Sequence, residues 1–406
     1  MRGKISILFL VLLVLAGYST YQSYIGNALE AKQCIEEAKS YEEKTLYIDA
    51  INSYEKAISL SKKSEQILIN IADDYYKMGD LSGYRKALKK VLASYPDSIA
   101  AISRMCNYYN VDRNNHSEMV KFISQKHREF PENEEINEWF QGVKGEYTVL
   151  YQSYEEIGPY RSGYAVYTRE GKKGLLKENG EIFINAVYDD ITFPQKKEKR
   201  VAVLDGVEVY YINFNGYKVG YPDEGTNPLD FSVRTKKCNN LRAVSDGKKW
   251  ALTKNGTKKT VTGYDYDQVL VDQWGYVDFN ENPWVCEAGK WHPVNKKGER
   301  FNESDYDDAK EALLKDGLIA VKQGSKWGFA DKEGNLVISC SYDDAYSFAE
   351  DFAAVKLNGL WGYLDREGKL IVEPKFDEAY SPNEKGIAPI KATDGSWKLI
   401  KFDIYD

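Results

Sequence analysis

A pattern that recurs in the C-terminal two-thirds of the chain constrains the fold more than any other feature. Residues 326–334 read KWGFADKEG, and residues 360–368 read LWGYLDREG. Each copy is followed by an aromatic-acid-acid-apolar tetrad, at residues 342–345 and 376–379. Such self-similarity predicts one small structural unit that recurs and buries its apolar face against its neighbours. The chain is therefore expected to be a repeat protein.

Copies of this unit can be aligned throughout residues 147–406, and seven are found. Each copy reads as strand, turn and strand, and a third short strand follows a link that ends in Gly. The region begins with a second half-copy at Tyr154 and ends with a first half-copy at Trp397. We therefore expect a seven-bladed propeller whose last blade is built from both ends of the domain, because closure hides sheet edges. An open β superhelix is the alternative.

This segment resembles the WG-repeat (KWG-type) family of bacterial exported proteins, most closely over residues 310–400. The resemblance implies a β-propeller-like array. A large indole beside a Gly that permits close backbone approach favours a packing role. The residues expected in that structural role are Trp250, Trp327, Gly328, Trp361, Gly362 and Trp397. The tetrad carboxylates are expected to accept backbone N–H groups at turns rather than to bind calcium.

Residues 28–145 show the 3.6-residue period of amphipathic helices instead. The stretch at residues 73–80, DDYYKMGD, resembles the turn of a tetratricopeptide repeat, and Pro96 and Pro131 close successive units. The third repeat departs from the pattern, because residues 110–116 replace the Gly turn. One face of such a stack is lined by the first helix of each pair. We expect that face to bind a peptide through Asp73, Tyr76, Asn107 and Asn110, or the array to act only as a spacer.

The first 21 residues differ from the rest of the chain. A basic start, MRGK, precedes an apolar run at residues 5–16, and Tyr18 and Tyr21 follow. This pattern is typical of an export signal or an N-terminal membrane anchor. An uncleaved anchor through residues 5–21 is favoured over a cleaved signal. Both interpretations place the rest of the chain outside the cytoplasm.

The composition limits the chemistry that is expected. A formal net charge of −7 with interspersed signs gives no basic stripe, so no nucleic acid partner is expected. The five cysteines are widely spaced, and the three histidines lie far apart in the sequence. No Walker, G-x-S-x-G or H-E-x-x-H motif occurs. We expect no catalytic residue, no metal site and no cofactor.

The segment that departs most from the repeat, at residues 272–284, is rich in aromatic residues. Irregular insertions on regular scaffolds often carry specificity. A glycan or another partner is therefore expected to contact Trp274, Tyr276, Trp284 and Trp291.

These observations favour a non-enzymatic, membrane-tethered binding or scaffold protein outside the cytoplasm, with a protein or peptide partner. A cell-envelope glycan binder is the second hypothesis. A propeller-type hydrolase with unrecognised carboxylates is the third.

Overall fold

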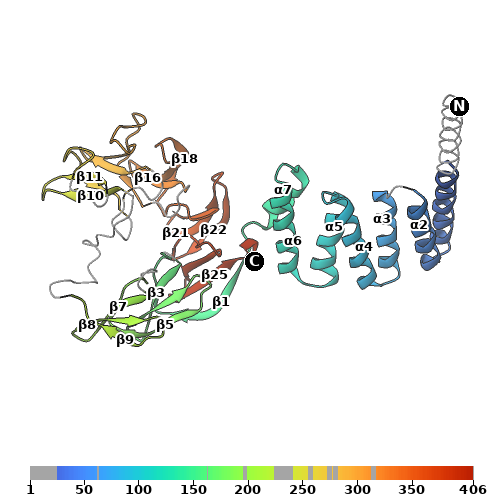
Figure 1. Ribbon diagram of the computed structural model, residues 1–406, viewed down its shortest axis with the longest axis horizontal. Coiled ribbons are helices and arrows are strands. Elements are labelled where there is room, and N and C mark those ends of the chain that lie inside the picture. Colours follow the sequence, from blue (N-terminus) through green and yellow to red (C-terminus); the bar gives the residue numbers. More distant parts are fainter. Residues whose placement is uncertain are drawn as a thin grey trace, which may run out of the picture. The chain divides into compact units, whose positions relative to one another are not determined.

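The computed structural model describes residues 25–61, 64–161, 163–194, 199–223, 241–254, 259–271, 277, 282–311 and 317–405. The chain divides into two compact units, Met1–Val143 and Lys144–Asp406. The first unit is helical and the second is built from strands (Figure 1). The expected anchor at residues 1–21 lies outside the described residues. Within the described part of the chain, no helix is both long and apolar enough to cross a membrane.

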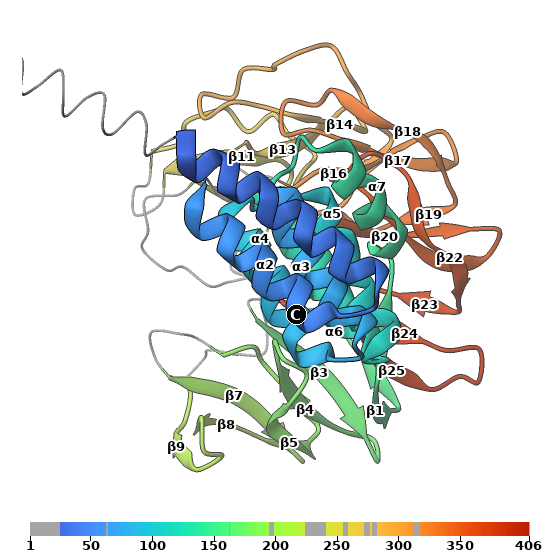
Figure 2. The same cartoon turned by 90° about the vertical axis from the view of Figure 1, so that its right-hand side faces the viewer.

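The helical unit is a series of antiparallel helices, each packed on the next along the chain. Residues 25–43 are helical and lie beside the following helix, α2 (Figure 2). The other helices are α2 (Tyr47–Leu60), α3 (Glu65–Lys77), α4 (Leu81–Ser94), α5 (Ile99–Asn107), η1 (Tyr108–Asp112), α6 (His116–Glu129) and α7 (Glu134–Val143). Their inner faces carry the small and bulky residues that the repeat pattern predicts, and Ala38, Tyr54, Ala72 and Leu88 are fully buried. These are tetratricopeptide-like helical hairpins.

Local signals explain where these helices begin and end. Gly79 has φ 76° directly after α3, a conformation that Gly adopts without strain. The Asp80 side chain then accepts a hydrogen bond from the Gly83 N–H, at 2.9 Å, and caps α4. In the third repeat, where this signal is missing, α5 runs on into the π-helical turn η1. The Asn115 side chain caps α6 by accepting from the Glu118 N–H, at 3.2 Å.

The described residues of the β unit form seven antiparallel sheets, the number that the repeat count predicts. Six of them follow one another along the chain, and their strands neighbour each other in chain order. The strands of the first three are β2 (Glu156–Ile157), β3 (Tyr164–Arg169), β4 (Lys172–Lys177), β5 (Ile182–Tyr188); β6 (Asp190–Ile191), β7 (Arg200–Asp205), β8 (Glu208–Asn213), β9 (Lys218–Gly220); and β10 (Leu241–Ser245), β11 (Trp250–Lys254). The strands of the next three are β12 (Gln268–Val269), β13 (Trp284–Glu287), β14 (Lys290–Pro293); β15 (Asp308–Ala309), β16 (Ile319–Gln323), β17 (Lys326–Ala330), β18 (Leu336–Tyr342); and β19 (Asp344–Ala345), β20 (Phe352–Leu357), β21 (Leu360–Asp365), β22 (Leu370–Phe376).

The seventh sheet joins the two ends of the β unit. Its order is β1 (Tyr147–Tyr154), β25 (Trp397–Phe402), β24 (Ile387–Lys391) and β23 (Glu378–Ala379), and the turn η3 (Asp403–Tyr405) follows it. Tyr147 pairs with Phe402, and Tyr154 pairs with Trp397. The prediction that both ends of the domain build one blade is confirmed, and the β unit has a propeller-like architecture.

The tetrad has a larger part in the sheets than the sequence indicates. The expected unit has three strands, but the four-stranded sheets each gain a further two-residue strand from the tetrad. Tyr342 is the last residue of β18. Asp344 and Ala345 form β19 and pair with Lys356 and Val355 of the following sheet. The tetrad is therefore the crossover between sheets, because its two halves are hydrogen-bonded in different sheets.

Candidate functional site

The residues expected to bind a peptide lie on α3, α5 and η1, where they contact other polar groups of the chain. Arg104 of α5 donates two hydrogen bonds to the Asp73 carboxylate, at 2.7 Å from Nε and 2.9 Å from Nη2. The Tyr76 hydroxyl donates to the Asp112 carboxylate of η1, at 3.2 Å. Asp73 and Tyr76 thus connect α3 to the third repeat. A ligand of this face would have to compete with these hydrogen bonds.

The other two residues predicted for this face, both from the third repeat, are exposed. Asn110 Oδ1 lies 2.6 Å from Nδ1 of His116, across the turn that replaces the Gly signal. Asn107 is exposed at the end of α5. Bidentate pairing with Asp73 raises the pKa of the Arg104 guanidinium.

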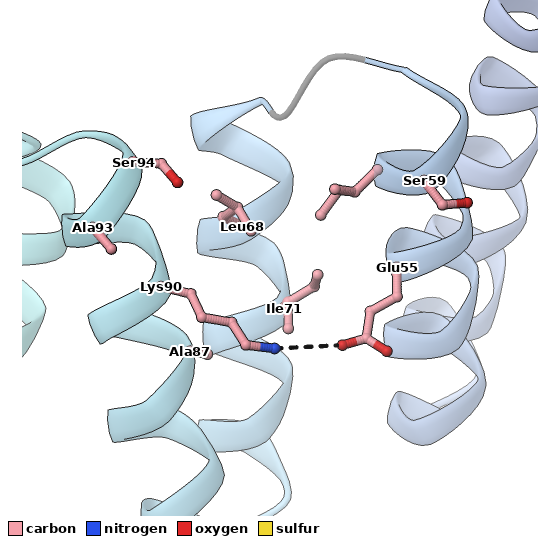
Figure 3. A pocket seen from close by; sticks show the side chains of 9 residues that line it. Glu55, Ser59, Leu68, Ile71, Ala87, Lys90, Ala93 and Ser94 are labelled. Carbon is pink, nitrogen blue, oxygen red and sulfur yellow. Dashed lines mark ion pairs between the residues drawn. The ribbon is translucent and has the colours of Figure 1, made fainter.

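A hollow of about 420 Å³ lies elsewhere on the helical unit, between α2 and α4 (Figure 3). It is lined by Glu55, Ile58 and Ser59 of α2, Leu68 and Ile71 of α3, and Ala87, Lys90, Ala93 and Ser94 of α4. Leu68 and Asp73 are five residues apart on α3, which places them roughly 140° apart around the helix. The hollow therefore opens away from the face on which Asp73 lies.

The walls of the hollow are apolar, and charged groups stand at its mouth. Leu68 and Ile71 are buried beneath it, and small Ala87 and Ala93 leave space on the α4 side. Glu55 and Lys90 form an ion pair at 3.8 Å whose side chains are 52% and 70% exposed. Sequence reasoning missed this site. The signal available in the sequence was the combination of small residues on α4, Ala87 and Ala93, with apolar residues on α3, Leu68 and Ile71.

In the β unit, three of the recurring indoles lie in the core. Trp327, Trp361 and Trp397 are at most 6% exposed, whereas Trp250 is 37% exposed. The Trp361 ring stacks on Tyr346 with centroids 5.2 Å apart. Tyr346 follows β19, so the stacked rings join the β19–β20 loop to β21 within one sheet.

The Gly that follows each of two indoles is required by close backbone approach. A Cβ at Gly328 would lie 2.4 Å from the Ile338 carbonyl oxygen, and one at Gly362 would lie 2.4 Å from the Val372 carbonyl oxygen. Both contacts are to the bulged outer strand of the same sheet. No side chain larger than hydrogen fits there without a backbone shift.

The first acid of the tetrad connects neighbouring sheets. Lys326 of β17 donates to the Asp343 carboxylate at 2.6 Å, and the Gly359 N–H of the β20–β21 turn approaches its other oxygen at 3.4 Å. The bond from Lys326 lowers the pKa of the Asp343 carboxyl. The same arrangement recurs at Asp189, with Lys172 at 2.6 Å and the Gly206 N–H at 2.7 Å. These carboxylates accept backbone N–H groups at turns, as predicted.

The aromatic residues predicted to form a ligand surface near residue 280 require a correction. Trp284 is 1% exposed and Trp291 is 7% exposed, and both pack in one core cluster with Tyr306. They are not a surface platform for a glycan, because the strands β13 and β14 turn both rings towards the next sheet. Trp274 and Tyr276 lie outside the described residues.

A buried histidine on β14 was also not foreseen. His292 is 1% exposed, and neither ring nitrogen has a hydrogen-bond partner. Asp305 and Glu287 lie 3.6 and 3.9 Å from its two nitrogens. Burial lowers the pKa of His292, and the nearby Arg300 acts in the same direction. The ring is therefore neutral at neutral pH.

One ion pair joins sheets that are not neighbours in the chain. Arg161, which follows β2, donates to Glu311, which follows β15, with Nη1 3.1 Å from Oε2. Both side chains are about one-third exposed, at 32% and 28%. The loops after the short inner strands therefore meet in the β unit.

Comparisons with known proteins return solved structures and one family model. The solved structures that the chain resembles include the first tetratricopeptide repeat domain of Spaghetti (RPAP3) bound to an HSP90 peptide, with 17% identity over 28% of this chain and 90% of that chain and a TM-score of 0.23. The WD40 β-propeller domain of Doa1 is 9% identical over 62% of this chain and 93% of that chain, with a TM-score of 0.35. Hsv2p of Kluyveromyces lactis is 11% identical over 60% of this chain and 96% of that chain, with a TM-score of 0.31. No curated protein matches the chain.

A family model described as "WG containing repeat" matches residues 327–361 and 361–397. Each match begins at an indole whose following Gly the structure shows to be sterically required, at positions 328 and 362. Residues 327–397 are therefore two WG-containing repeats.

Proposed function

We propose that this protein is a non-enzymatic scaffold that binds a protein partner through its helical unit. The observation that carries the proposal is the apolar hollow between α2 and α4, at whose mouth an exposed ion pair stands. Its volume, about 420 Å³, lies within the roughly 300–1,000 Å³ of ligand sites. Its walls offer apolar contact and few groups that would orient a reacting substrate.

The propeller-like β unit supports the same proposal in a different way. Its indoles and tetrad carboxylates are used within and between sheets, so the repeat residues serve the rigidity of the unit. A rigid repeat array offers a broad surface to a partner. The apolar run near the N-terminus supports a location outside the cytoplasm, with residues 5–21 in the membrane.

Photocrosslinking in cells tests the binding proposal. A photoreactive amino acid is placed in the full chain at Ala93, an exposed residue that lines the hollow, and in a second variant at Ala28, which is exposed on the first described helix. We expect one discrete protein adduct from position 93 that is missing from position 28. If neither position yields a protein adduct in cells, the proposal is wrong.

A separate experiment tests the location. Protease added to intact cells stripped of their outer layers reaches only proteins outside the cytoplasmic membrane. We expect the chain to be digested while a cytoplasmic marker survives, and to remain with the membrane pellet before digestion. Protection of the chain alongside the cytoplasmic marker would refute the location.

A further inference from the structure

The charges around the hollow are unequally distributed between its two helical walls. Helix α4 has four basic residues and no acidic one, and its exposed cations are Arg85, Lys86, Lys89 and Lys90. Helix α2 contributes Glu55 to the mouth of the hollow. The α4 wall is therefore a positively charged border beside an apolar depression.

Two of these cations are placed to meet a molecule in the hollow. Lys90 lines the hollow, and Lys86 lies one helical turn before it on the same side of α4. No carboxylate of the described residues forms an ion pair with Lys86. Arg85 points elsewhere, because its guanidinium lies 6.0 Å from the centre of the Tyr109 ring.

The single ion pair at the mouth is easily exchanged. Glu55 and Lys90 are 3.8 Å apart and both are more than half exposed. Exposed pairs of this kind contribute at most about 1 kcal/mol, since water screens them. A carboxylate of a partner can therefore replace Glu55 in the ion pair with Lys90 at little cost in free energy.

We propose that the hollow binds an acidic amphipathic segment of a partner protein, whose apolar side chains fill the space over Leu68 and Ile71 while its carboxylates meet Lys86 and Lys90. Grooves between helices bind amphipathic helices through apolar residues three or four positions apart. This inference rests on the proposed function, and it adds the chemistry of the partner and the face that binds it.

Fluorescence anisotropy with designed peptides tests the inference on the full chain. The probe is a labelled helix-forming peptide that has two leucines four residues apart and is otherwise rich in glutamate. Two matched peptides replace the leucines by serine or the glutamates by lysine. We expect only the leucine–glutamate peptide to bind, and more weakly as salt is added, because screening shortens the reach of the charges.

Variants of the hollow give expected changes of opposite sign. Lys86→Glu together with Lys90→Glu should weaken binding by about tenfold, and Glu55→Lys should strengthen it by a few-fold. Ala93→Trp should block the hollow and abolish binding, whereas Ala28→Trp, the same change at an exposed position on another helix, should have no effect. Circular dichroism of each variant shows whether the helices are retained.

The outcomes separate the inference from the proposed function. Equal binding of the lysine-rich peptide, or binding that Ala93→Trp leaves unchanged, overturns the inference. Absence of binding by all three peptides also overturns it. If the in-cell adduct at position 93 persists in those cases, the scaffold proposal stands and only the partner chemistry is wrong.

Discussion

Asp74 offers the sharpest test of the physical reasoning, because its carboxyl is fully buried in α3. Lys77 donates to Oδ1 at 3.0 Å, while Oδ2 has no hydrogen-bond partner. Burial, and then the nearby Glu42, raise the pKa of Asp74 from 3.8 to about 6, although Lys77 acts in the opposite direction. Tyr47 and Tyr54 are the other titratable groups nearby.

The sign of the pH dependence follows from this direction. The folded chain binds the Asp74 proton more tightly than the unfolded chain does. The contribution of Asp74 to stability is therefore fully present below about pH 4, and is lost as the pH rises through about 6. The shift from 3.8 to about 6 corresponds to about 3 kcal/mol. The Glu42 side chain is 23% exposed, so water screens part of its repulsion, and we expect about 2 kcal/mol.

The substitution Asp74→Asn mimics the protonated carboxyl. Its amide can accept from Lys77 and donate to Glu42, so no buried atom is left without a partner. We expect the helical unit to be more stable by about 1–2 kcal/mol at neutral pH and to lose most of its pH dependence between about pH 4 and 6.5. Urea unfolding of the full chain, followed by helical circular dichroism at several pH values, measures both effects.

The neighbouring substitution Asp73→Asn is the matched control. Asp73 is one-third exposed in its pair with Arg104, so its loss should lower stability by less than about 1 kcal/mol. The pH dependence between about 4 and 6.5 should remain as in the parent chain. If Asp74→Asn lowers stability at neutral pH, or keeps the parent's slope, the account of a destabilised buried carboxylate is wrong.

Three further predictions concern packing and the links between sheets. Gly328→Ala should destabilise the β unit by about 2–4 kcal/mol in chemical denaturation. The control is Gly142→Ala, at a helical position where the added Cβ meets no neighbouring element within 4 Å. It should stabilise the helical unit by about 0.5–1 kcal/mol. Trp361→Ala should cost about 3–5 kcal/mol through the cavity it leaves, and equal stability of parent and variant would contradict the burial of this ring. Asp343→Asn should lower the melting temperature of the β unit at neutral pH. The melting temperature of the parent chain should fall to that of the variant only in acid. The pKa of Asp343 is lowered, so its contribution to stability is lost only as the pH falls below the usual range of a carboxyl. A melting-temperature difference that persists unchanged in strong acid would refute the role of the Asp343 charge.

Periodicity in the sequence predicted the two kinds of repeat and the blade shared by Tyr154 and Trp397, because burial and hydrogen bonding impose the same spacing on every copy. The number of strands in each sheet was harder to predict from the sequence. The two-residue strand at Asp344–Ala345 exists only through its pairing with Lys356 and Val355, and no local pattern marks so short a strand.

The candidate site was the least predictable feature. Asp73 and Tyr76 were correctly assigned to the repeat stack, but their engagement with Arg104 and Asp112 depends on how two repeats pack. The burial of Trp284 has the same origin, since an aromatic residue in an irregular segment looks exposed until the neighbouring sheet covers it.

Helix and strand periods, the Gly turns and the recurring indoles are local properties of the chain, so the residue pattern predicted the helical region and the longer strands of the β unit. Which surfaces remain open to a partner depends on how the helices and sheets pack. The hollow between α2 and α4 exists because Ala87 and Ala93 face Leu68 and Ile71 from another helix. The volume left between side chains is a property of their packing, which no single stretch of sequence contains.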